Sequence, residues 1–66
     1  MEIVLSRHAK EQARERGVTI KEIKKTIQQG AKHLQGTKIV SDFMYVRVVY
    51  KKINKTPFVI TVMIRR

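Results

Sequence analysis

Apolar and polar residues alternate over residues 43–53 and again over residues 58–64. This alternation is typical of β-strands that bury one face and leave the other in solvent. The segment Asn54-Lys55-Thr56-Pro57 between them predicts a hairpin connection. The apolar face is expected to carry Met44, Val46, Val48 and Tyr50 from the first strand and Phe58, Ile60, Val62 and Ile64 from the second. The opposite, more basic face is expected to carry Phe43, Tyr45, Arg47, Val49, Lys51, Val59, Thr61, Met63 and Arg65.

Residues 6–30 show helical spacing instead, with two helix starts. Thr19 and Glu22 match a capping box, in which the two side chains satisfy each other's backbone N–H groups. The helix that follows presents one apolar face and is expected to end at Gly30; that face is made by Ile20, Ile23 and Ile27. An earlier helix is predicted from its cap at Ser6 to about Arg16.

The earlier helix has very few apolar residues and ends at Gly17, which can adopt the left-handed conformation of a C-cap. Only Ala9 and Ala13 can face a core, so we expect this helix at the edge of the sheet with its cations exposed. Short strands are expected near residues 3–5 and at residues 37–40, the latter between turns at Gly36 and Asp42.

These elements predict a single domain over residues 1–66 with the order β–α–α–β–β–β. The expected fold class is α+β, with two N-terminal helices packed on one face of a small, mostly antiparallel sheet. In its core, Ile20, Ile23 and Ile27 are expected to pack against Val46, Val48, Ile60 and Val62.

A net charge of +10 is the strongest indication of a partner. It results from 15 Lys and Arg against 5 Asp and Glu, and after Glu22 the only acidic residue is Asp42. Self-repulsion of this size destabilises a compact chain, and a polyanion would relieve it. RNA or single-stranded DNA is the first partner predicted, and an acidic protein is the second.

The chain has no cysteine, which agrees with a reducing compartment. Its N-terminal apolar run covers only residues 3–5 and resembles neither a signal peptide nor a membrane span. We therefore expect a cytoplasmic location and no membrane partner.

Most enzyme chemistries lack their residues in this chain. The two histidines are 25 positions apart, and without cysteine they predict no metal site and no cofactor. The three glycines stand alone, so no phosphate-binding loop is predicted. The remaining histidine, arginine, lysine and tyrosine suit metal-independent RNA cleavage, which needs proton transfer and cations near the phosphate.

The residues predicted for catalysis are His8, Arg16 and Arg47. His8 is either a general acid/base or an ordinary helical histidine beside a carboxylate. Arg47 is placed on the open sheet face by its neighbours Val46 and Val48. The residues predicted for nucleic-acid binding are Arg7, Lys10, Arg14, Tyr45, Lys51 and Arg65. Aromatic and basic residues on one sheet face form either a platform for single-stranded RNA or a solvated surface.

The opening Ser6-x-His8-Ala9, followed by Glu15-Arg16-Gly17-Val18, resembles a small uncharacterised prokaryotic family. That family begins S-x-H-A, continues to R-G-[IV] and ends in a β-hairpin, and on this resemblance its relatives are the RelE/ParE-like toxins. The resemblance implies a RelE-like fold, RNA on the exposed side of the sheet, scattered Arg, Lys, His and Tyr as catalytic groups, and an acidic antitoxin. His8 and Arg16 are the predicted site residues that match the motif.

Two function classes stay open at this point. The first is a metal-independent ribonuclease of the toxin type. The second is a non-catalytic module that binds nucleic acid or a protein partner, which includes a ParE-like gyrase inhibitor, because relatives that share an architecture need not share a chemistry.

Overall fold

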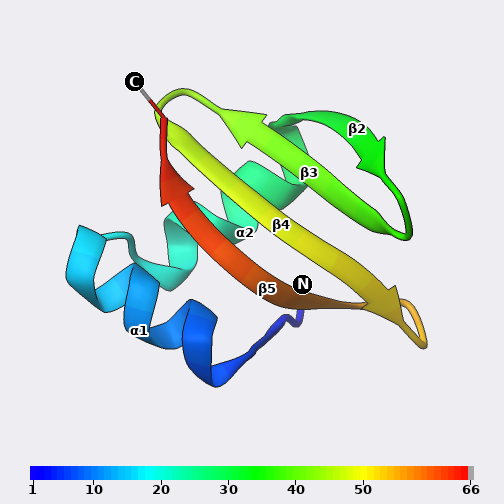
Figure 1. Cartoon of the computed structure of the whole chain (residues 1–66), viewed down its shortest axis with the longest axis horizontal. Helices are drawn as coiled ribbons and strands as arrows, with labels where there is room; N and C mark the ends of the chain where they lie inside the picture. The colour runs from blue at the N-terminus through cyan, green and yellow to red at the C-terminus, as the bar shows by residue number, and fades with distance from the viewer. Residues whose placement is uncertain (66) are drawn as a thin grey trace.

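The computed structural model describes residues 1–65, which form two helices and five strands (Figure 1). In chain order the elements are β1 (Val4–Leu5), α1 (Arg7–Arg16), α2 (Ile20–Gln29), β2 (Ala31–Gln35), β3 (Lys38–Phe43), β4 (Val46–Ile53) and β5 (Thr56–Ile64). In the described part of the chain, neither helix has the length and apolar character that crossing a membrane requires.

Both helices begin at the predicted caps. The hydroxyl oxygen of Ser6 accepts a hydrogen bond from the backbone N–H of Ala9 at 3.0 Å, and Gly17 closes α1 with φ 67°. At the start of α2, Thr19 and Glu22 make both hydrogen bonds of the capping box. The two helix predictions are therefore confirmed. They could be made from the sequence because capping and helical spacing depend only on residues a few positions apart.

Gly30 follows α2 for a packing reason. Its φ of −72° is open to any residue, but a Cβ there would collide with the Ser41 hydroxyl and the Thr26 carbonyl oxygen. These two groups need the space because Ser41 Oγ donates a 2.6 Å hydrogen bond to that carbonyl. This buried contact fixes the end of α2 against β3.

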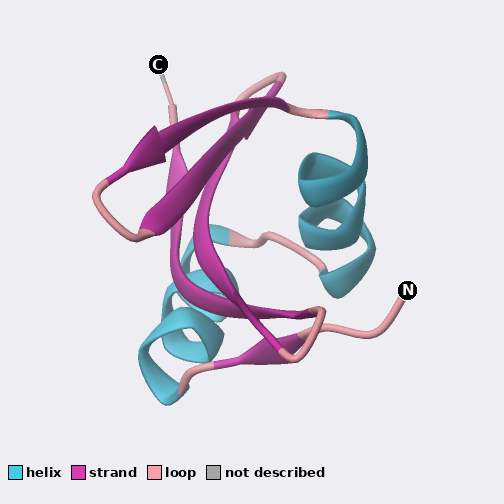
Figure 2. Cartoon of the chain, turned by 90° about the vertical axis from the view of Figure 1, so that its right-hand side faces the viewer, coloured by secondary structure: helices cyan, strands magenta, loops and turns pink. Residues whose placement is uncertain are grey.

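The strands form one sheet in the order β1-β5-β4-β3-β2, and the sheet is strongly curved (Figure 2). The β1–β5 pair is parallel, and the other three pairs are antiparallel. The expected RelE-like arrangement of two helices on one face of a small, mostly antiparallel sheet is therefore wrong: the sheet is five-stranded and mixed, with α1 against β5 and β1 and α2 against β3 and β4. The pairing of β1 with β5 joins the two ends of the chain, and no local pattern predicts such a contact.

The outer edge of β5 is covered partly by β1 and partly by α1. Beyond the two residues that β1 pairs, Ser6 Oγ donates to the carbonyl of Ile60 at 3.3 Å, and Gln12 Oε1 accepts from the N–H of Val62 at 2.9 Å. Because these side chains satisfy backbone groups of an edge strand, the first helix is anchored to the sheet by more than its two alanines.

Three strand boundaries differ from the prediction. β2 was not expected, because all five of its residues are exposed and show no apolar alternation. Phe43 ends β3, so Met44 and Tyr45 form a turn before β4 and the predicted strand at 43–53 is interrupted; Asp42 lies within β3 rather than in a turn. The hairpin between β4 and β5 uses only Asn54 and Lys55, both with positive φ, as in a two-residue turn.

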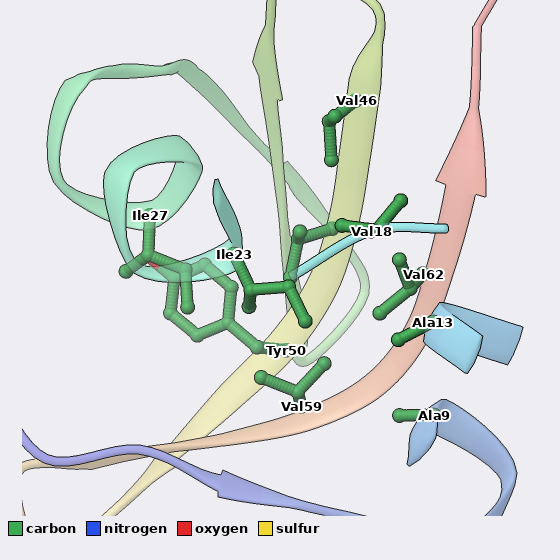
Figure 3. Close-up of a cluster of buried hydrophobic side chains, with 10 residues drawn as sticks. Ala9, Ala13, Val18, Ile23, Ile27, Val46, Tyr50, Val59 and Val62 are labelled. Carbon is green, nitrogen blue, oxygen red and sulfur yellow. The ribbon is translucent and has the colours of Figure 1, made fainter. Parts of the chain in front are cut away.

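The core contains α1, α2 and sheet residues, but not all the predicted ones (Figure 3). Its members are Ala9, Ala13, Val18, Ile23, Ile27, Val46, Val48, Tyr50, Val59 and Val62. Ile60 is replaced there by Val59, because the ladder pairs Val49 with Thr61 and Tyr50 with Val59 and leaves Ile60 as an extra residue. Such a bulge shifts the alternation by one residue, so the predicted faces of β5 are right at Val62 and reversed at Phe58.

Candidate functional site

The face of the sheet turned away from this core, called the open face below, carries an ion-pair cluster around Asp42. The open face includes His33, Val40, Asp42, Arg47, Val49, Thr61 and Met63, as the strand register places them. Arg47 Nε and Nη2 donate to the two carboxylate oxygens of Asp42 at 2.7 and 3.0 Å. Arg65 Nη1 lies 3.8 Å from the same carboxylate. Arg47 is on the predicted face, but its guanidinium is already bound by a carboxylate.

The hydrogen bonds from Arg47 lower the pKa of Asp42 below its usual value, against the opposing effect of burial. The positive charges of Arg47, Arg65 and His33 lower it further. These side chains come from β2, β3, β4 and the residue after β5, so the open face collects charges that lie far apart in the sequence.

Asp42→Asn is expected to weaken the acid dependence of folding. A carboxyl group whose pKa is lower in the folded state stabilises the fold above its unfolded pKa of about 4, and this contribution is lost as the pH falls through the folded pKa. The variant should therefore be less stable than the parent at pH 7. Below pH 4 its free energy of unfolding should fall less steeply with decreasing pH, by a slope equivalent to at most one bound proton. Urea unfolding between pH 2 and 7 measures this, with Glu11→Gln on α1 as the control. An unchanged acid limb in Asp42→Asn would contradict the assignment.

His33 is a residue that the sequence reasoning missed. It lies in β2 opposite Val40, on the same face as Asp42, and its charge acts on that carboxylate. The sequence signal for the strand that carries His33 is weak, because β2 is fully exposed and its apolar residues do not alternate. Its position depends on the β2–β3 pairing rather than on its neighbours in sequence.

Tyr45 does not lie on the open face as predicted. It is in the turn between β3 and β4, and its hydroxyl donates a 2.9 Å hydrogen bond to Glu22 Oε2 on α2. This bond raises the pKa of Tyr45. The pKa of Glu22 is lowered, first by the hydrogen bond from the Thr19 backbone and then by Tyr45. The predicted platform of Tyr45 with Arg47 and Arg65 therefore does not form; Lys51 is exposed on β4, beyond the ion-pair cluster.

α1 presents a row of free cations to solvent. A helix turns about 100° per residue, so Arg7, Lys10 and Arg14 lie within about 60° of one another, beside the stripe of the buried alanines. All three are exposed, and none takes part in an ion pair in residues 1–65. We call these three residues the basic ridge.

The predicted catalytic set His8, Arg16 and Arg47 is not assembled. The same helical geometry places His8 about 100–160° from the three residues of the basic ridge, on the side of Glu11 and Glu15. Arg16 lies 3.7 Å from the carboxylate of Glu15. Arg47 is on the open face, whereas α1 packs against the core face of β5, so the sheet separates it from His8. These positions favour the ordinary alternative for His8, a surface histidine beside carboxylates.

Within residues 1–65 no three His, Asp or Glu side chains lie close enough together to hold a metal ion. Neither a curated protein nor a solved structure matches the chain. A family model described as "Domain of unknown function (DUF4258)" matches residues 5–64, from the end of β1 to the end of β5. The match covers nearly all of the helices and strands described above, and the chain belongs to this DUF4258 family.

Proposed function

We propose that this protein is a non-catalytic module that binds single-stranded RNA, or single-stranded DNA, mainly through backbone phosphates. The observation that carries the proposal is the basic ridge: Arg7, Lys10 and Arg14 are exposed, lie together on one side of α1 and form no ion pair among residues 1–65. The net charge of +10 supports the same class of partner.

The basic ridge suits phosphate binding better than the open face does. Arg47 and Arg65 share the carboxylate of Asp42, so a phosphate on the open face would have to compete with an existing ion pair. A phosphate at the basic ridge would not have to displace an ion pair. Arg7 and Arg14 are about 10 Å apart along α1, a distance that spans more than one phosphate of a strand. We therefore place the backbone of the bound strand along α1.

Titration of a labelled, unstructured RNA at several salt concentrations tests the proposal. Each phosphate that a cation neutralises contributes about −0.7 to the slope of log K against log salt for a single strand. A strand held by the ridge and neighbouring lysines should give a slope steeper than about −2. Binding that is absent at 50 mM salt, or independent of salt, would reject the proposal and leave an acidic protein as the partner to look for.

Metal-independent cleavage is the second candidate, and one observation favours it. His33 shares the open face with Arg47 and Arg65, so a histidine and two arginines occur together there, although the predicted histidine was His8. Incubating the same RNA in EDTA separates the candidates: an intact strand supports the binding module. Cleavage that is abolished in His33→Ala and retained in His8→Ala would instead assign an enzyme. A kinship with the toxins named above stays a prediction, as do an acidic antitoxin and a cytoplasmic location.

A further inference from the structure

A small cleft lies between α2 and the turn that joins β3 to β4, away from the basic ridge and from the open face. Its volume is about 160 Å³, and its walls are Glu22, Lys25, Thr26, Phe43, Met44, Tyr45 and Val46. Pockets for drug-sized ligands measure about 300–1,000 Å³, so this cleft holds one flat ring at most. Two aromatic rings and a thioether form the apolar wall, and a cation and a carboxylate stand at its rim.

Met44 is the first residue of the two-residue turn between β3 and β4, in which Phe43 pairs with Val46. Its φ of 55° lies in the left-handed region, which such a turn requires and in which residues other than Gly or Asn are unfavourable. Met44 is 74% exposed, so its side chain is available to a ligand. A thioether is an adaptable surface for a flat ring.

The ring of Tyr45 is held in place before any ligand arrives. Its hydroxyl is bound to Glu22 at 2.9 Å, and Glu22 is fixed in turn by the N–H and hydroxyl of Thr19 at 2.9 and 3.1 Å. Tyr45 is nevertheless 51% exposed, so about half of the residue is open to solvent. A ring that is already ordered loses little entropy when a ligand stacks on it.

Cations flank the cleft on the α2 side. Lys25 Nζ lies 5.9 Å from the centre of the Phe43 ring, and Lys21 precedes it by one helical turn on the exposed side of α2. A ligand that places a flat ring in the cleft and a phosphate next to it would match both features. Unstacked bases of single-stranded RNA are recognised in this way, by aromatic side chains with cations nearby.

We propose that this cleft binds one unstacked nucleobase of the RNA strand, between Met44 and Tyr45, with the adjoining phosphate at Lys21 and Lys25. The inference rests on the proposed function and adds a base-recognition site to it. Glu22 and the Tyr45 oxygen present hydrogen-bond acceptors at the rim, so a base with an exocyclic amino group fits better than one without. Cytosine is therefore favoured over uracil, which has a carbonyl oxygen at the same position.

The test compares three RNAs of equal length and charge: oligocytidine, oligouridine, and a chain of abasic ribose phosphates. Stacking of one base on an aromatic side chain corresponds to about 5- to 150-fold in affinity, so oligocytidine should bind at least fivefold more tightly than the abasic chain. It should also bind more tightly than oligouridine. Tyr45→Ala should lower oligocytidine binding to the abasic level while leaving binding of the abasic chain unchanged.

Met44→Gly is a second variant, which separates a loss of binding from a loss of folding. Glycine removes the strain at φ 55°, so this variant should be at least as stable as the parent in urea, yet bind oligocytidine more weakly. Equal affinity of the parent for oligocytidine and the abasic chain would overturn the base site and leave the phosphate-binding function intact. An equal loss for both RNAs in Tyr45→Ala would overturn it as well. No binding of any of the three RNAs would reject the proposed function itself, and the base site with it.

Discussion

Ile23→Ala is expected to remove a large part of the stability of this domain. Ile23 is fully buried in the core, and truncation of a buried isoleucine to alanine typically costs about 2–5 kcal/mol. At about 0.05–0.15 kcal/mol per residue, a domain of this size has only about 3–10 kcal/mol in total. Urea unfolding followed by circular dichroism should show a much lower midpoint, or a variant that is already partly unfolded without urea.

Ile20→Ala is the matched control, because it makes the same chemical change one helical turn earlier on α2. Ile20 is 48% exposed and belongs to no core cluster, so this variant should stay within about 0.5 kcal/mol of the parent. Equal losses in the two variants would mean that α2 packs through the whole isoleucine face that the sequence predicts, rather than through Ile23 and Ile27 alone.

The contrast between these two isoleucines illustrates what the sequence can predict. The capping box and the helical spacing of α2 depend on residues a few positions apart, and both are confirmed. Which part of the apolar face becomes buried depends on where α2 meets β3 and β4, and that is decided by contacts such as Ser41 to Thr26. Spacing alone treats Ile20 and Ile23 as equivalent, whereas packing distinguishes them.

The strands show the same division between local and distant causes. Alternation correctly places Val46, Val48 and Arg47 on opposite faces of β4. It fails before Ile60, because the bulge opposite Val49 and Tyr50 adds one residue to β5, and a shift of one residue reverses the side chains on the Phe58 side of the bulge. No turn residue or glycine in the sequence marks that position.

The same difference between local and distant causes explains which residues of the candidate sites could be predicted. The sequence identified the cations of α1, because a helix that carries them in one row needs only its own periodicity. The positions of His33 and Tyr45 depend on strand boundaries. His33 lies in a strand without an apolar pattern, and Tyr45 lies in a turn that interrupts a stretch of alternating residues. His8 drew attention through its neighbours in sequence, but the helix separates it from the row of Arg7, Lys10 and Arg14.

Replacing all three residues of the basic ridge by glutamine is expected to give the largest change in RNA binding. If each of Arg7, Lys10 and Arg14 neutralises one phosphate, the triple variant should lose about 2 from the magnitude of the salt slope. Since the electrostatic contribution vanishes near 1 M salt, this change corresponds to roughly a hundredfold weaker binding at 0.1 M. Glutamine is a good helix former, so α1 should be retained, as circular dichroism can verify.

The control removes the same charge elsewhere: Lys38, Lys52 and Lys55 are exposed lysines on the strands and hairpin turn, outside every proposed contact. Their triple glutamine variant lowers the net charge of the protein by the same amount and therefore weakens long-range attraction equally. A ridge that contacts phosphates directly must lose more affinity and more salt dependence than this control. Equal losses would mean that the strand is held only by overall charge, and a larger loss in the control would place it on the strand side of the molecule.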